Sequence, residues 1–307
     1  MEVLTLTHSE KFDLVESVQL GGAMSVSPLP TVEELDIYYE SKYWQAPDRP
    51  HTGDYSQEER EYLSLQSKVI ENLVPLENFS ALDIGCGEGF LLKQLIDSGH
   101  QAIGLDLNDF AINKFNPSVA PHLVKGNVFN SLDSFIQSKQ KFDVIFLNHI
   151  FEHLPKPEEL LEKLKGVLAS AGFLVISVPN DFSQLQLALK KNGFYKKEYF
   201  VSYPDHLHYF TKESLIQLLS SKGYSFIDGI ADFPIEWFIA NDHSNYAKNP
   251  MVGKAAHRAR IFLETQINLR DLQLVLDFWR SLFNLGQGRS ITAIFKLDEI
   301  YETDYSF

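Results

Sequence analysis

Apolar residues follow two alternating periods along the middle of the chain. Short apolar runs, typical of buried strands, recur from residue 80 onward, and segments with apolar residues at helical spacing separate them. This alternation of strands and helices predicts an α/β fold, a parallel sheet with helices on both faces. The expected strands cover 81–84, 101–105, 122–124, 142–147 and 173–178, and the expected helices lie around 89–98, 109–114, 131–138 and 157–169.

The residues before this region follow another pattern. Two apolar runs flank Gly21 and Gly22, which predicts a β-hairpin. Thr31 is expected to cap a short helix. Ser56 is expected to begin a longer amphipathic helix that Pro75 ends. We therefore treat residues 1–55 as an N-terminal leader or lid.

The alternating rhythm also changes after Pro179. Two further helices and two strands are expected, and the segment before the last strand contains two helical patterns, the second dense in apolar residues. We interpret residues 232–286 as a helical insertion, which is expected to shape the acceptor pocket or a homodimer contact. The main domain then comprises residues 56–231 and 287–307. The expected elements are helices at 182–191 and 212–222, strands at 224–230 and 290–297, and insertion helices near 251–267 and 270–285.

The charge balance argues against a nucleic-acid substrate. The 307 residues include 27 Lys and Arg and 41 Asp and Glu, which gives a net charge of −14. Such a surface repels a phosphate backbone. We therefore expect no nucleic-acid partner. The 23 phenylalanines can build a large core or an apolar pocket.

The chain lacks the usual marks of secretion or membrane insertion. Cys86 is the only cysteine, so neither an internal disulfide nor a cysteine-rich zinc site can form. The first residues show no basic segment followed by an apolar one, and no apolar run is long enough to cross a bilayer. We expect a cytoplasmic protein without an integral membrane segment.

The strongest motif is Ala81-Leu82-Asp83-Ile84-Gly85-Cys86-Gly87-Glu88-Gly89, an apolar strand that runs into a glycine-rich turn and a helix. Glycines are needed where the backbone turns tightly and a ligand approaches closely. About 20 residues further on, Asp106 follows the next strand, where an acid can accept both hydroxyls of a ribose. A tight turn without a ligand, and for Asp106 a helix cap, are the structural alternatives.

This run resembles the first motif of class I methyltransferases that use S-adenosylmethionine (SAM) and release S-adenosylhomocysteine (SAH). The resemblance implies a Rossmann-like methyltransferase sheet. It places Asp83, Gly85, Gly87 and Gly89 along the methionyl part of the cofactor and Asp106 at the ribose. We also assign to the cofactor site the neighbouring residues Cys86, Leu107, Asn127, Val128 and Asn148. Asn127 stands where the family often has an aspartate that faces the adenine amine, and a plain turn asparagine is the alternative.

The fourth expected strand continues into Asn148-His149-Ile150-Phe151-Glu152-His153-Leu154-Pro155. This stretch is similar to the H-x-x-E-H-L-x-x-P loop of a subgroup that includes ubiquinone-type O-methyltransferases and many sugar methyltransferases. Residues 173–180 and 205–211 also resemble that subgroup. The resemblance covers about 56–230 and 288–297. In this subgroup, aromatic residues such as Tyr43 and Trp44 often close over the cofactor, although plain packing is the alternative.

Two histidines, His149 and His206, are the candidate catalytic residues. His149 would lie at the end of a strand, above the methyl group, where an imidazole can take the proton of an acceptor hydroxyl. A histidine that packs or caps the loop is the alternative. His206 and His208 alternate before a helix, so one of them is expected to face the site while the other is solvated. Glu152 and His153 are expected mainly to fix the loop.

We expect no metal ion. His149, Glu152, His153 and His206 are residue types that bind divalent cations, and their pattern is similar to that of metal-assisted RNA 2′-O-methyltransferases. However, His149 replaces an acid at the first position, so a histidine base without metal is our preferred hypothesis.

The acceptor is expected to be a small molecule. By analogy with the subgroup it is a sugar, free or nucleotide-linked, in surface polysaccharide biosynthesis. The alternative is a small aromatic or isoprenoid metabolite, methylated on O or N. An oxidoreductase that binds an NAD-type dinucleotide is the rival of another class, because it uses a similar turn. The basic residues around Lys190 and Arg260 would suit a diphosphate, but solvated helix faces are the preferred explanation.

Overall fold

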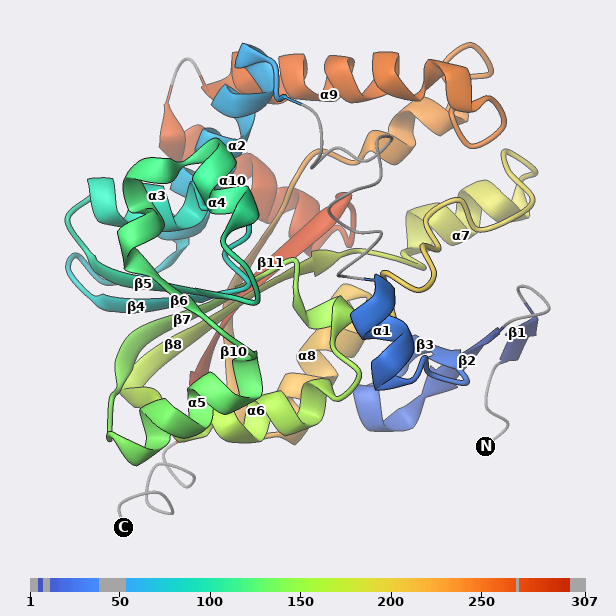
Figure 1. Ribbon diagram of the computed structural model, residues 1–307. Coiled ribbons are helices and arrows are strands. Elements are labelled where there is room, and N and C mark those ends of the chain that lie inside the picture. Colours follow the sequence, from blue (N-terminus) through green and yellow to red (C-terminus); the bar gives the residue numbers. More distant parts are fainter. Residues whose placement is uncertain (1–4, 8–11, 39–53, 269–270, 299–307) are drawn as a thin grey trace.

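The computed structural model describes residues 5–7, 12–38, 54–268 and 271–298, which form an α/β structure with a seven-stranded sheet at its centre (Figure 1). The strand order is β10-β11-β8-β7-β4-β5-β6. The strands are β4 (Ser80–Ile84), β5 (Gln101–Asp106), β6 (Leu123–Lys125), β7 (Phe142–Asn148), β8 (Leu168–Pro179), β10 (Tyr224–Ala231) and β11 (Ser290–Leu297).

The sheet is mixed rather than wholly parallel. Strands β4 to β8 pair in parallel, as the strand–helix alternation predicts. Strand β11 comes after the alternating region and pairs antiparallel with both β8 and β10. The chain reaches β11 through the two helices that follow β10. Strand β11 then lies between β8 and β10, which both run in the opposite direction. Because β10 therefore runs parallel to β8, its carboxyl end lies at the same edge as those of β4, β5, β7 and β8.

Helices cover both faces of this sheet, as predicted (Figure 1). Helices α2, α3 and α10 lie above the sheet in the view of Figure 1, and α5, α6 and α8 lie below it. The helices are α1 (Val32–Tyr38), α2 (Gln57–Leu73), α3 (Phe90–Asp97), α4 (Phe110–Phe115), α5 (Val128–Gln137), α6 (Pro157–Lys165), α7 (Gln184–Lys191), α8 (Lys212–Ser221), α9 (Gly253–Asn268) and α10 (Leu272–Asn284). Short 3₁₀ turns cover Val18–Leu20, Pro117–His122, Phe151–His153, Ile235–Ala240 and Pro250–Val252.

Caps explain several helix boundaries. The Ser56 hydroxyl accepts the Glu59 N–H while the Glu59 carboxylate accepts the Ser56 N–H, a reciprocal pair that begins α2 as predicted. Thr31 forms the same reciprocal pair with Glu34. The expected helix over 157–169 is too long, because α6 ends at Lys165 and β8 begins at Leu168. Apolar residues at 167 and 168 continue the helical pattern, but Val167 lies in the turn and Leu168 begins the strand.

A smaller antiparallel sheet lies beside the main one, with the order β1-β2-β3-β9. It contains the predicted hairpin around Gly21 and Gly22. Its apolar face forms a second core with α7 and with Ile239. The small sheet thereby joins the N-terminal segment to the region that follows β8. Its strands are β1 (Thr5–Thr7), β2 (Asp13–Ser17), β3 (Ala23–Ser27) and β9 (His208–Tyr209).

The segment between β10 and β11 contains the two helices that the periodicity predicts. Helix α10 packs against β10, and α9 packs against α2. Contact between α10 and the sheet is close at Gly229, where a Cβ atom would lie 2.4 Å from Cζ of Phe283. Among the described residues, no helix is long and apolar enough to cross a membrane.

The close approach at Gly229 gives a test of the fold. We expect Gly229→Ala to lower the free energy of unfolding by about 1–3 kcal/mol, because the added methyl must displace the Phe283 ring. Gly253→Ala is the control, since its Cβ would meet nothing nearer than Tyr246 at 3.8 Å. Urea unfolding followed by circular dichroism compares the two variants. Equal stability of both would show that α10 does not pack on β10 in this way.

Candidate active site

A large cavity opens at the carboxyl ends of β4, β5, β7, β8 and β10. Its volume is about 1380 Å³. Ligands of open α/β sheets bind at this edge, where the loops after parallel strands converge. All but one of the residues predicted for the site line the cavity, and Gly89 is the exception. The predicted residues that line it are Asp83, Gly85, Cys86, Gly87, Asp106, Leu107, Asn127, Val128, Asn148, His149 and His206.

The glycine-rich turn between β4 and α3 requires glycine for two reasons. Gly85, Gly87 and Gly89 all have positive φ angles, which side chains rarely adopt. In addition, a Cβ at Gly85 would lie 2.4 Å from Cδ1 of Ile150, and one at Gly89 would lie 2.9 Å from the Ile112 side chain. Gly89 therefore serves the packing of the turn and the start of α3, rather than the cavity wall as predicted.

Asp106 closes the turn from the neighbouring strand. Its Oδ2 accepts the Gly87 N–H at 3.0 Å, and its Oδ1 accepts the Asn108 N–H at 3.2 Å. Burial raises the pKa of this carboxyl, while its hydrogen bonds from the backbone lower it. Each carboxylate oxygen can accept a second hydrogen bond, so Asp106 retains capacity for ribose hydroxyls.

Asp83 lies at the end of β4, under the turn, and only 1% of its surface is exposed. Neither carboxylate oxygen has a hydrogen-bond partner among the described residues. Burial, with a smaller contribution from the charge of Asp106, raises the pKa of Asp83 to about 7. The nearby Leu92 N–H opposes this rise in the pKa of Asp83. A buried carboxylate with unused acceptor capacity suits a cationic ligand group in the cavity.

Asn127 begins α5, and its amide oxygen accepts the N–H groups of Phe129 and Asn130. The predicted role of that oxygen as acceptor for an adenine amine is therefore wrong in this conformation, because the helix cap uses it. Val128 follows on the same helix and Leu107 stands on the loop after β5. Both line the cavity beside Asn127.

His149 directly follows β7 with a φ of 54°, a conformation that is uncommon for a residue with a side chain. Its N–H donates to the Ser177 carbonyl at the end of β8, and its Nδ1 lies 3.5 Å from Oε1 of Glu152. The half-exposed ring lines the cavity. Backbone strain at such a position is often retained for function.

Glu152, His153 and His206 form a compact cluster beside His149. Their ligand atoms lie within 4.8 Å of one another. Burial favours the neutral forms of both residues, but the electrostatic attraction between Glu152 and His153 outweighs this effect. As a result, the pKa of Glu152 falls to about 2 and that of His153 rises to about 9. Asp205 adds to this effect, because its backbone carbonyl accepts a hydrogen bond from His153 Nδ1 at 2.7 Å. Both nitrogens of His153 therefore face acids, which supports the predicted role of this pair in fixing the loop.

The two alternating histidines have different surroundings. His206 lines the cavity, and both burial and His153 lower its pKa. The expectation that His208 is solvated is wrong. It belongs to β9, is buried, and hydrogen-bonds Ser25 through Nδ1 and the Leu154 carbonyl through Nε2. The short strand pairing of β9 with β3 covers it, which its sequence spacing did not indicate.

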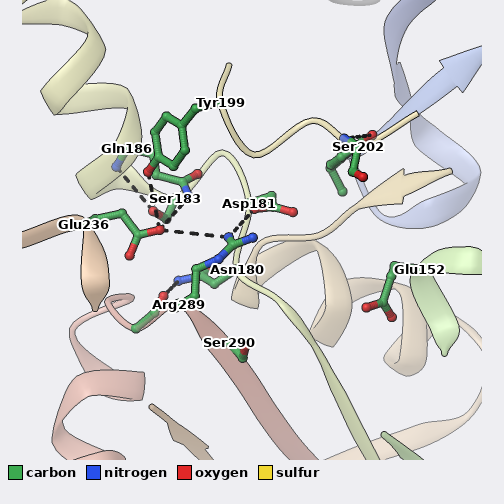
Figure 2. A network of polar contacts seen from close by, with 12 residues as sticks. Glu152, Asn180, Asp181, Ser183, Gln186, Tyr199, Ser202, Glu236, Arg289 and Ser290 are labelled. Atoms are coloured by element: carbon green, nitrogen blue, oxygen red, sulfur yellow. Dashed lines mark hydrogen bonds and ion pairs between the residues drawn. The ribbon is translucent and has the colours of Figure 1, made fainter. Parts of the chain in front are cut away.

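A buried polar network behind the cavity was not predicted (Figure 2). Arg289 pairs with Asp181 and lies 3.9 Å from Glu236, which accepts a hydrogen bond from Gln186. Beside it, Arg260 lies 3.7 Å from Asp232 and 3.9 Å from Glu264. Arg260 thus lies among acids. It belongs neither to a solvated helix face nor to a site for a diphosphate, the two explanations that the sequence suggested. Lys190 is bound by Glu198.

Other residues of the cavity wall were also missed. Ser290 and Thr292 come from β11, Asp232 directly follows β10, and Trp279 comes from α10. The segment 232–286 therefore reaches the cavity, as we expected. Antiparallel insertion of β11 brings these residues to the site, and no motif marks them. Tyr43 and Trp44, the predicted lid aromatics, lie outside the described residues.

Comparison with known families identifies this arrangement. Residues 55–228 match the family described as "Methyltransferase domain". The chain belongs to this family. The match decides between the two predicted classes in favour of a SAM-dependent methyltransferase domain over an NAD-type oxidoreductase.

Individual relatives of the methyltransferase domain are distant. The ubiquinone biosynthesis O-methyltransferase of Coxiella burnetii is 25% identical over 37% of this chain and 49% of its own length. The malonyl-[acyl-carrier protein] O-methyltransferase of Halalkalibacterium halodurans is 29% identical over 42% and 55%, respectively. The chain thus spans about half the length of these curated relatives.

A solved structure supports the fold over nearly the whole chain. The 1,6-didemethyltoxoflavin-N1-methyltransferase of Burkholderia thailandensis, solved with its substrate and SAH, matches 97% of this chain and 100% of its own. The TM-score is 0.51 and the identity 12%. At this identity the likeness concerns the fold alone.

The methyltransferase site fits SAM on its own geometry. The orphaned Asp83 carboxylate suits a cationic methionyl part, the turn leaves room only for glycine at Gly85, and Asp106 has acceptor capacity for ribose. Asp83, Asp106 and the turn would hold the cofactor, which supplies an activated methyl group on a sulfonium.

We predict that Asp106→Ala weakens SAM binding about 10- to 100-fold while the protein stays folded, because charge-assisted hydrogen bonds contribute about 1.5–3 kcal/mol each. Asp109→Ala is the matched control, since that exposed carboxylate pairs with Lys125 instead. Titration calorimetry measures both. An unchanged dissociation constant for Asp106→Ala would remove this residue from the site.

We also predict that SAM affinity rises about fivefold between pH 6 and pH 8. Asp83 is neutral below its pKa of about 7 and ionised above it, and only the ionised form attracts a cation. Asp83→Asn is expected to lack this increase, and the difference between the two proteins cancels the titration of the ligand itself. Parallel pH profiles for both proteins would show that Asp83 does not face the cation.

Proposed function

We propose that this protein transfers the methyl group of SAM to a hydroxyl of a small acceptor, with His149 as the general base. The observation that supports this is the position of His149, which is held in a strained conformation at the end of β7 and lines the same cavity as the glycine-rich turn. In the reaction, a bond forms between the acceptor oxygen and the methyl carbon as the bond from carbon to sulfur breaks. The hydroxyl proton passes to the imidazole, and SAH is released.

The residues around His149 fix its backbone and stabilise the protonated form of its imidazole. Oε1 of Glu152 lies 3.5 Å from Nδ1 of His149, so the carboxylate stabilises the imidazolium that forms when the proton is taken. The N–H bond to Ser177 fixes the backbone of His149 between β7 and β8. His206, with a lowered pKa and a place in the same wall, is a second candidate to contact the acceptor.

We propose a sugar as the acceptor. Polar side chains from several strands line the part of the cavity beyond the turn, among them Ser177, Asp232 and Thr292. A small aromatic or isoprenoid metabolite is the second candidate, favoured by Trp279 and Ile230 in the same wall. The net charge of −14 supports a small molecule over a nucleic acid. A homodimer through residues 232–286 stays a hypothesis, which a monomer mass in light scattering would exclude.

We expect His149→Ala to lower kcat by about 100-fold or more, with little change in SAM affinity, because general-base catalysis contributes about that much. Release of SAH measures turnover, and calorimetry measures binding. His243→Ala, which removes an exposed histidine outside the cavity wall, is the control. Full turnover by His149→Ala would assign the base to another residue.

We also expect EDTA to leave turnover unchanged, because His149 stands where the metal-assisted methyltransferases have an acid, so these residues offer a cation less negative charge. Loss of activity with EDTA, restored by magnesium or manganese, would instead assign Glu152, His153 and His206 to a metal site.

A further inference from the structure

The acceptor half of the cavity carries an unbalanced charge. Among the described residues that line the cavity wall beyond the glycine-rich turn, Glu152, Asp205 and Asp232 contribute carboxylates. Among the described residues of the lining, Lys156 is the only lysine or arginine, and it is largely exposed and lies 3.3 Å from the Glu159 carboxylate. His153 also lines the cavity, but it already pairs with Glu152 and Asp205. A phosphate or carboxylate group of an acceptor would therefore meet like charge there, and each of these cations already has an acidic partner.

The two arginines nearest to this wall are already neutralised. Arg260 lies between Asp232 and Glu264, and its guanidinium lies over the Tyr62 ring at 5.2 Å. Arg289 is bound by Asp181, with Glu236 at 3.9 Å, as Figure 2 shows. Neither residue belongs to the cavity lining. Both arginines are thus paired with buried acids, so neither is available to bind an anionic group of a ligand.

Asp232 is the carboxylate that reaches the cavity from this region. Its Oδ1 accepts the Ser290 N–H at 2.7 Å, which fixes the side chain at the end of β10. The nearest Arg260 nitrogen is 3.7 Å from Oδ2, beyond hydrogen-bond range. The second oxygen can therefore take a hydrogen bond from a ligand.

Glu152 provides an independent sign of a missing donor. Its side chain is 1% exposed, yet its Oε2 has no hydrogen-bond partner among the described residues. Leaving a buried charged acceptor unsatisfied is costly, so such an atom calls for an explanation. Glu152 lines the cavity, and Figure 2 shows its carboxylate directed toward the side on which Asp181 and Ser290 lie. A hydroxyl or amino group of the acceptor would satisfy it.

We infer that the acceptor is a free polyol or amino sugar, without phosphate or carboxylate, whose hydroxyl or amino groups donate to Glu152 and Asp232. These two residues determine specificity, because each offers an oxygen to a donor and repels an anion. The inference rests on the proposed function and narrows it: a nucleotide-linked sugar, whose diphosphate needs cations, does not fit this wall.

A matched ligand panel tests this class. Protein saturated with SAH is mixed with hexoses and amino hexoses, with their 1-phosphates, and with the corresponding uridine diphosphate sugars, and the melting temperature is recorded. We expect the unphosphorylated compounds to raise it and the phosphorylated ones to leave it unchanged. A larger rise with a phosphorylated compound, or no rise with any compound, would overturn the inference.

Variants assign the effect to the two carboxylates. Asp232→Asn and Glu152→Gln are each expected to weaken binding of the best ligand about tenfold, while SAH affinity stays within about twofold. Asp228→Asn is the matched control, because Asp228 lies in β10, four residues before Asp232, and pairs with an arginine, Arg280 at 2.8 Å, outside the cavity lining. Equal loss in Asp228→Asn, or no loss in the other two, contradicts the assignment.

The two proposals fail in different ways. Failure of SAH to bind the wild-type protein in calorimetry would remove the proposed function itself. Normal SAH binding together with turnover of a phosphorylated acceptor would leave methyl transfer intact and overturn only the acceptor class.

Discussion

The geometry of the site depends on one constraint, the tight turn after β4 and its connection to β5. The N–H groups of Gly85 and Cys86 both donate to the Leu105 carbonyl, and the Gly87 N–H donates to Asp106. These bonds fix the turn against the next strand, so the parallel pairing of β4 with β5 positions the floor of the cavity. Because Asp106 closes the turn and also lines the cavity, we propose that the same carboxylate links the local fold to the binding of the cofactor.

The other half of the site depends on a different arrangement. His149 follows β7, and Ser177 at the end of β8 holds its backbone. Further along the edge, β11 enters antiparallel and brings Ser290 against Asp232. Two ion pairs stabilise this part of the structure, Arg260 with Asp232 and Arg289 with Asp181. In our proposal, backbone turns define the half of the cavity that binds the cofactor, and side-chain charges define the half that binds the acceptor.

The sequence predicts well the glycine-rich turn and the part of the cavity wall around it. Glycines at fixed spacing after an apolar strand have few other physical explanations, and Asp106 follows at the distance that one helix and one strand impose. The alternation of strands and helices likewise predicts the order of the elements, because each apolar period indicates one type of element. The acceptor half is different, because Asp232, Trp279 and Thr292 meet only through long-range pairing, and no local pattern marks them. The burial of His208 and Arg260 likewise depends on distant segments, β3 and α2, that cover them.

A crystal structure of the protein with SAH tests the central claim most directly. The account predicts that the ribose hydroxyls bond to Asp106, that the amino group faces Asp83, and that the sulfur points toward His149 across the cavity. An SAH molecule whose sulfur faces away from His149, or whose ribose lies remote from Asp106, would contradict it.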